Sequence, residues 1–121
     1  MKQAKSYRWG MSTPAAEALA GDIHTIAAAG SDLDGATRIT GEIVNATSGS
    51  GGIKLPTDCK ARDMFVVNND IGGTLSLYPP TSAGTINGGS AGAAITISDN
   101  DSCIVVAITN DDFITVPRTP S

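Results

Sequence analysis

Short alternations of apolar and polar residues, broken by turn-forming residues, run along most of this chain. Ile53 and Leu55 alternate with polar neighbours until Pro56, which has no N–H to give to a neighbouring strand. Residues 74–78 (Thr-Leu-Ser-Leu-Tyr) alternate in the same way, as a half-buried antiparallel strand does, until Pro79-Pro80 ends them. The pattern predicts a chain of short strands.

Two segments are apolar at nearly every position. Residues 64–67 (Met-Phe-Val-Val) are long enough for a strand buried on both faces and too short for a helix. Residues 102–109 (Ser-Cys-Ile-Val-Val-Ala-Ile-Thr) predict another strand. We expect the core to contain the apolar residues of the central and C-terminal strands: Phe65, Val67, Leu75, Leu77, Ile95, Ile97, Ile104, Val106 and Ile108.

Weaker patterns complete the fold prediction. Residues 22–29, 92–98 and 113–116 favour strands, and residues 37–44 favour one more, with Ile39 and Ile43 on one face. Residues 45–52 (Asn-Ala-Thr-Ser-Gly-Ser-Gly-Gly) have the composition of a flexible loop. With six to eight short strands and no convincing long helix, residues 21–121 are expected to form an all-β domain, a compact antiparallel β-sandwich or β-barrel-like unit.

Residues 1–20 differ from the rest and form a separate segment. They hold the only Trp, Trp9, close to Tyr7, and show no clean period of 2 or 3.6 residues. Residues 13–20 have the signals of a short helix, with Thr13 as the N-cap and Pro14 at the first helical position. One interpretation is a poorly ordered terminus. The other is an extended or partly helical N-terminal arm, whose Tyr and Trp anchor it on a partner.

Composition and charge narrow the function classes. Aromatic residues make up only 4% of the 121 residues, so the core is built from small aliphatic side chains, and we expect the chain to gain burial as an oligomer. The net charge is −4, while residues 1–20 carry Lys2, Lys5 and Arg8 against Glu17 alone. The body is therefore acidic, which argues against a nucleic-acid partner because phosphate binding needs basic patches.

The cysteines and the single histidine give no catalytic signature. Cys59 and Cys103 are expected to be free thiols, because no apolar run typical of a secretory signal precedes them. Cys103, inside an apolar strand, is expected to be buried and inert. His24 is expected to be partly buried and hydrogen-bonded, because it has no second histidine to form a metal or catalytic cluster. The sequence predicts a protein that is not an enzyme and needs no cofactor.

Two Asx clusters admit two interpretations. Residues 99–101 (Asp-Asn-Asp) and 110–112 (Asn-Asp-Asp) offer oxygen ligands of the kind that Ca²⁺ takes, although neither has EF-hand spacing. The same residues favour β-turns for conformational reasons, and we prefer that interpretation. No window approaches about 18 consecutive apolar residues, so no membrane partner is expected.

A series of turn-centred motifs resembles a known viral module. They are Gly52-x-x-Leu55-Pro56, Asp63-x-Phe65-Val66-Val67-Asn68-Asn69, Leu75-x-Leu77-Tyr78-Pro79-Pro80 and Gly84-x-Ile86-Asn87-Gly88. Over residues 22–116 this order resembles a β module of tailed-bacteriophage virion proteins, among them capsid decoration (cement) proteins, head fibres and some tail-fibre domains. The chain departs from the module in its last strand, where Asp112-Phe113-Ile114 stands in place of a frequent Trp-Tyr pair.

The resemblance implies a structural function in the virion. The leading expectation is a capsid decoration protein that binds the major capsid protein on the outer head surface as a homotrimer, after synthesis in the cytoplasm of the bacterial host. The alternative is a head-fibre or tail-fibre module that binds a host surface or glycan. Tyr7, Arg8 and Trp9 are the expected capsid-contact residues of the arm. Tyr78, Pro79 and Pro80, with Ile86 and Asn87, are the expected interface loops, at the oligomer axis or facing the capsid.

Overall fold

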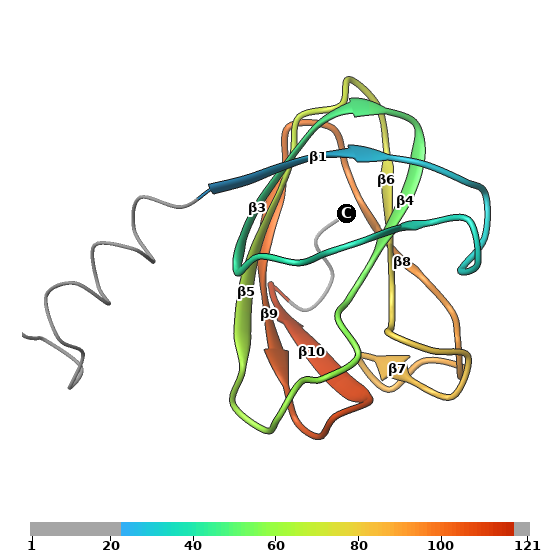
Figure 1. Ribbon diagram of the computed structural model, residues 1–121, viewed down its shortest axis with the longest axis vertical. Coiled ribbons are helices and arrows are strands. Elements are labelled where there is room, and N and C mark those ends of the chain that lie inside the picture. The colour runs from blue at the N-terminus through green and yellow to red at the C-terminus, as the bar shows by residue number, and fades with distance from the viewer. Residues whose placement is uncertain (1–22, 118–121) are drawn as a thin grey trace, which may run out of the picture.

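The computed structural model of the chain describes residues 23–117, which form ten β-strands (Figure 1). The strands are short, and no helix occurs within these residues. Their bounds are β1 Ile23–Ala28, β2 Thr37–Arg38, β3 Ile43–Gly49, β4 Gly51–Lys54, β5 Met64–Asn69, β6 Leu75–Tyr78, β7 Thr85–Ile86, β8 Ile95–Ile97, β9 Ser102–Ala107 and β10 Asp112–Val116.

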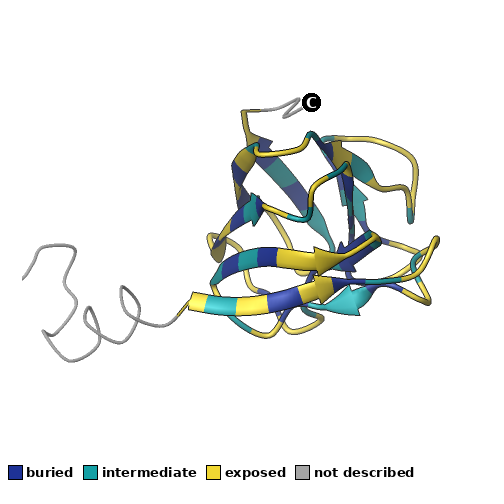
Figure 2. Ribbon diagram, turned by 90° about the horizontal axis from the view of Figure 1, so that it is seen from above, coloured by how far each residue is buried: buried dark blue, intermediate teal, exposed yellow. Residues whose placement is uncertain are grey.

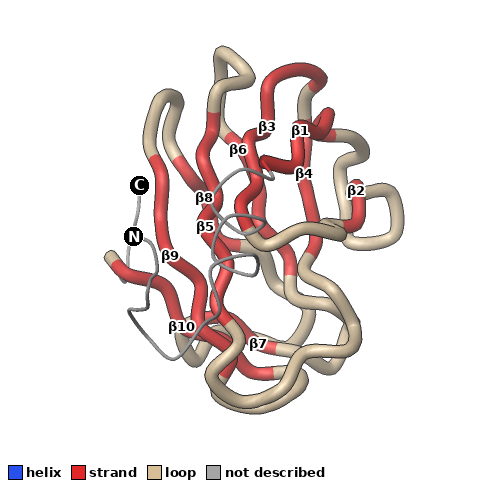
Figure 3. Tube along the Cα trace, turned by 60° about the vertical axis from the view of Figure 1, so that its left-hand side comes forward, coloured by secondary structure: helices blue, strands red, loops and turns tan. Residues whose placement is uncertain are grey.

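The strands form two sheets that the chain visits in turn. The six-stranded sheet has the order β1-β3-β5-β9-β10-β7, and the four-stranded sheet has the order β2-β4-β6-β8. From β1 to β6 each successive strand joins the other sheet, so β1, β3 and β5 lie parallel, as do β2, β4 and β6. This first half of the domain is a short β-solenoid of three coils, seen as two walls of strands in Figure 3.

The last strands reverse direction and close one end of the solenoid. Strand β8 pairs antiparallel with β6, and β9 pairs antiparallel with β5. Strand β10 then pairs antiparallel with β9 and parallel with the two-residue strand β7. At the opposite end, β1 and β2 are the edge strands of the two sheets.

The all-β class is confirmed. The predicted antiparallel sandwich or barrel-like arrangement is wrong, because the first six strands form the parallel coils of a β-solenoid. The prediction of a flexible loop at residues 45–52 is wrong, because these residues form most of β3 and the first half of β4. Their small side chains let the chain turn the corner between two stacked coils. A Cβ at Gly49 would lie 2.1 Å from the Ala28 carbonyl oxygen, so this corner excludes larger residues.

The core lies between the two sheets and is aliphatic apart from Phe65, Phe113 and the two cysteines, Cys59 and Cys103. Of the predicted core residues, Phe65, Val67, Leu75, Leu77 and Ile97 are buried and Ile95 is partly buried, as expected.

The prediction is wrong for Ile104, Val106 and Ile108 on and after β9. Ile104 is 36% exposed, Ile108 is 50% exposed and Val106 is only partly buried. The alternate residues of this strand face the core instead, and they are Cys103, Val105 and Ala107. Because residues on both faces of this strand are apolar, the sequence does not mark which face is inward.

Two further strand predictions need correction. Residues 37–44 are not one strand but β2 and the start of β3, joined by a corner at residues 39–42, so Ile39 is buried while Ile43 lies on the outer face. Strand β5 is not buried on both faces, because Met64 and Val66 are 52% and 40% exposed. The apolar residues of these strands therefore continue onto the outside of the molecule.

Candidate interaction surface

A row of aliphatic side chains crosses the outer face of the six-stranded sheet. The register pairs Ile23 with Ile43, Ile43 with Val66, Val66 with Ile104, and Ile104 with Val116. Residues directly opposite each other in a sheet project from the same face. Their neighbours along each strand point into the core, an alternation that Figure 2 shows as buried and exposed bands along the strands.

Two further rows flank this aliphatic row. On one side, Met64, Val106 and Ile114 are paired across β5, β9 and β10 and extend the apolar surface. On the other side is a polar row, in which the Asn68 amide donates a 2.8 Å hydrogen bond to the Asn45 side-chain oxygen. Its members are Thr25, Asn45, Asn68 and Ser102. We call these three rows together the outer sheet face; none of its residues is charged.

Several large aliphatic side chains of this row are exposed next to one another. Ile23 is 54% exposed and Val116 is 55% exposed at the two ends, with Val66 at 40% between them. With strands about 4.8 Å apart and rows about 6.8 Å apart along each strand, the outer sheet face covers roughly 400 Å², of which the apolar positions make up roughly two thirds. The largest apolar patch on a typical single chain is of this order and is often functional.

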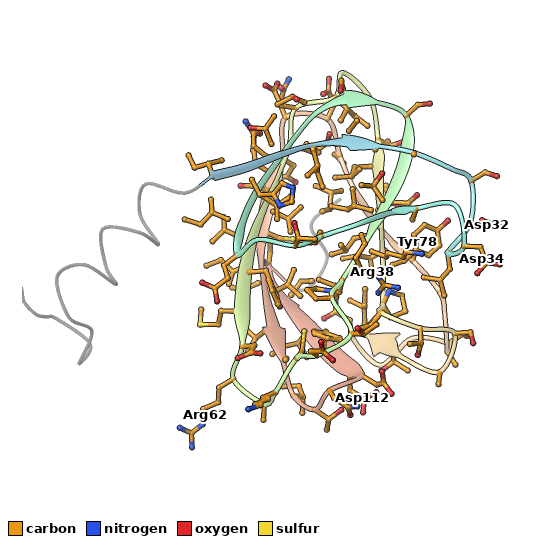
Figure 4. The ribbon with its side chains drawn as sticks, in the orientation of Figure 1. Asp32, Asp34, Arg38, Arg62, Tyr78 and Asp112 are labelled. Carbon is orange, nitrogen blue, oxygen red and sulfur yellow. The ribbon has the colours of Figure 1, made fainter. Side chains whose placement is uncertain are left out.

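Charged side chains lie outside these three rows, some of them at the border, such as Asp70 after β5 and Asp112 at the start of β10. Asp32 and Asp34 project from the loop beside the four-stranded sheet, on the far side of the molecule from β5 (Figure 4). On that side the guanidinium of Arg38 donates hydrogen bonds to the carbonyls of Leu55 (2.7 Å) and Pro80 (3.0 Å). Arg38 therefore has a structural role in holding the corners of the solenoid.

The described part of the chain begins at the edge of the outer sheet face. Tyr7, Arg8 and Trp9 lie outside the described residues, as does the predicted helix at 13–20. Ile23 is the first residue of β1 and the end of the aliphatic row. Within the described residues β1 is an edge strand of its sheet and pairs with β3 alone.

The predicted loop Tyr78-Pro79-Pro80 is largely internal. Pro79 and Pro80 are buried, and Tyr78 is partly buried with its hydroxyl 3.3 Å from the Ser31 carbonyl oxygen, to which it donates. The prolines end β6 as the sequence predicted, but they leave little side-chain surface for a partner. Their role at an interface stays a prediction.

The second predicted interface loop is a tight turn. Ile86 is 3% exposed and packs in the core, whereas Asn87 and Gly88 both have positive φ. The Asn87 side chain binds Thr115 on β10, accepting from its N–H (2.9 Å) and donating to its hydroxyl (2.9 Å). This geometry gives the turn a structural role, and no observation tests its contact with a partner.

Both cysteines are free, as predicted, and both are buried, which the sequence predicted for Cys103 alone. Burial, with the negative charges of Asp63 and Asp58 adding to it, raises the pKa of Cys59 from 9.0 to about 11. Burial and the charge of Asp101 raise the pKa of Cys103 to about 11 as well. At neutral pH both are protonated thiols, which are poor nucleophiles.

These raised pKa values predict that stability falls as the pH rises from about 9 to about 11. In this window the unfolded chain releases thiol protons that the folded chain retains, so ionisation favours unfolding. Urea titrations at a series of pH values should show the fall. The Cys59→Ala/Cys103→Ala variant should lose this part of the pH dependence. An equal slope in that variant would show that other groups cause it.

The other candidate chemical groups have structural surroundings. His24 is partly buried, with Nδ1 2.8 Å from the Thr40 hydroxyl, as expected. Residues 99 and 100 lie in a turn in which Asn100 has a φ of 63°, and residues 110 and 111 form the bend before β10, which begins at Asp112. Between residues 23 and 117 no three His, Cys, Asp or Glu side chains gather in a way that could hold a metal ion. That same part of the chain contains no helix suited to crossing a membrane.

A comparison with protein-family models finds none that matches this chain, and a comparison with curated proteins finds no match either.

Proposed function

We propose that this chain is a bacteriophage capsid decoration (cement) protein. In this proposal it binds the major capsid protein on the outer head surface as a homotrimer and stabilises the capsid without catalysis. The observation that carries the proposal is the outer sheet face, an uncharged surface suited to protein contact on a small body. The motif resemblance over residues 22–116 supplies the virion context.

The division of the chain into arm and body supports this function. Residues 1–20 combine Tyr7 and Trp9 with basic residues, and such aromatic and cationic side chains are typical anchors at protein interfaces. Three linked arms would multiply three modest contacts, since each later contact forms at a high effective concentration. The acidic body would leave the decorated particle negatively charged and soluble.

The alternative is a head-fibre or tail-fibre module that binds a host surface or glycan, and the surface of the domain favours it less. A depression of about 370 Å³ lies beside the β3–β4 corner, lined by the small residues 49–51, by residues 71–74 and by Ser76. Its lining has one large apolar side chain, Ile71, and no aromatic ring or charge. A binding site of this kind usually needs a few convergent polar or charged groups around an apolar floor.

Removing residues 1–20 should abolish capsid binding while the β domain stays folded. The arm contains the proposed anchors, whereas the described core and both sheets begin after it. Co-sedimentation with undecorated capsids measures binding, and circular dichroism with thermal melting measures folding. The full-length Trp9→Ala variant should bind at least ten-fold more weakly, as the loss of a buried aromatic anchor predicts. Undiminished binding of the truncated protein would show that the arm does not anchor it.

A further inference from the structure

We infer that the outer sheet face is where copies of this chain meet, with Val66 and Ile104 near the centre of the contact. This inference deepens the proposed function and rests on it only for the number of copies, three. It assigns the self-association to the aliphatic face rather than to the loops at Tyr78 and Ile86.

The absence of charge on this face favours a second copy as the occupant. The chain carries a net charge of −4, so two copies that met through ordinary parts of the body would repel each other. None of the positions on the three rows is charged. Depletion of charged residues is also characteristic of the centre of a protein interface. Copies of an acidic chain therefore meet here with the least electrostatic cost.

The apolar composition of the strands points the same way. Strand β5 has apolar residues at both inward and outward positions from Met64 to Val67, and β9 has them from Cys103 to Ala107. Such strands are typical of sheets covered on both faces. Among residues 23–117 only the inner face is covered, and contact with other copies would cover the outer face.

The size of the face indicates a modest contact between copies. Two faces of roughly 400 Å² would bury ~800 Å² together, which is below the ~1,200 Å² of a stable standard-size interface and predicts weak association. The number of copies, three, is taken from the proposed function and not from this area.

The test compares two matched charge insertions in the full-length protein. Val66→Glu places a carboxylate in the centre of the outer sheet face, where copies would bring like charges together. Thr96→Glu makes the same charge change at an exposed position of β8, on the four-stranded sheet. Light scattering should give three times the 12.2 kDa chain mass for the wild type and Thr96→Glu, and the single-chain mass for Val66→Glu. Circular dichroism should be unchanged in all three.

Three results would overturn the inference. They are a wild type that remains a single chain at ~100 μM, a folded Val66→Glu that keeps the wild-type mass, and loss of association in Thr96→Glu as well. In case Val66→Glu fails to fold, Val66→Thr keeps the side-chain shape and adds only a hydroxyl. It should raise the dissociation constant at least ~10-fold, because a buried hydroxyl without a partner is costly; no change would contradict the inference.

Capsid co-sedimentation separates this inference from the proposed function. If wild type and Val66→Glu differ in mass as expected but neither binds capsids, the self-association face stands and the decoration function fails. If the wild type binds capsids but Val66→Glu has the same mass in solution as the wild type, the decoration function stands and the self-association face has been assigned wrongly.

Discussion

Replacing Asn69 with Asp should destabilise the domain by about 4 kcal/mol or more, which corresponds to a fall in melting temperature of roughly 15 °C. Asn69 is 0% exposed at the end of β5. Its side-chain amide donates to the carbonyls of Gly73 (2.8 Å), Ile97 (2.9 Å) and Ser98 (3.0 Å). This one side chain joins β5, the turn that follows it and the end of β8.

The amide cannot be replaced by a carboxyl group at this site. The Ile71 N–H donates to the Asn69 Oδ1 at 3.1 Å, which fixes the nitrogen on the side of the three carbonyls. A carboxylate would place negative charge against those carbonyl oxygens in the absence of water. A protonated carboxyl would offer one donor where the amide offers two. Thermal unfolding followed by circular dichroism measures the loss.

Asn68→Asp is the matched control for this prediction. Asn68 precedes Asn69 on the same strand, makes the same change of charge on substitution and lies on the outer, partly exposed face. Its single described side-chain bond is to the Asn45 amide, which can turn to donate to a carboxylate. A cost below about 1 kcal/mol is expected. Equal destabilisation by the two substitutions would contradict the role that we give to Asn69.

Replacing Gly51 with Ala should destabilise the domain by about 4 kcal/mol or more, because the corner between β3 and β4 has no room for a side chain. Gly51 has a φ of +106°, and a Cβ there would lie 1.8 Å from the Gly30 carbonyl oxygen. Next to it, Gly52 exchanges backbone hydrogen bonds with Ala29 at 3.0 and 3.1 Å. To accept the methyl group, the first and second coils would have to separate and lose these bonds.

Two glycines in the turn after β5 serve as controls that separate the cost of a positive φ from the cost of steric overlap with the added methyl group. Gly72 has a φ of +88° but nothing within 4 Å of the position that a methyl group would take, so Gly72→Ala should cost only about 1 kcal/mol. Gly73 has open space and no positive φ, so Gly73→Ala should be close to neutral. Chemical denaturation of the three variants should rank them in this order. A Gly51→Ala variant as stable as Gly72→Ala would show that the coils are not packed this closely.

The strands could be predicted where polar and apolar residues alternate. In β6 the buried Leu75 and Leu77 alternate with partly exposed residues, and Pro79 ends the strand as expected. In β9 every position from Cys103 to Ala107 is apolar, so the sequence could not show which face is inward. The wrong choice concealed the outer sheet face, because it placed Ile104 and Val106 in the core.

The parallel order of the coils could not be predicted from local patterns. A hairpin and a solenoid corner are both made from glycine and small polar residues, so residues 45–52 suggested a loop. Their role depends on the close approach of Ala28 and Gly30, which precede them by about 20 residues. The same holds for Asn69, because its partners at Ile97 and Ser98 are distant in sequence and no local pattern indicates these hydrogen bonds.

The candidate surface itself could be found only from the register of the sheet. Its residues come from five strands, and no pair of neighbouring residues in the sequence marks them. The one signal in the sequence was an excess of apolar residues in β5 and β9 over what one inner face requires. The low aromatic content, 4%, added to it because it suggested a core small enough to need partners.

The most direct test of the decoration function is co-sedimentation of the full-length protein with undecorated phage capsids, followed by thermal melting of the capsids. The proposed function predicts saturable binding in multiples of three copies and a higher melting temperature of the decorated capsid. A protein that stays in the supernatant and leaves the capsid melting temperature unchanged would contradict it.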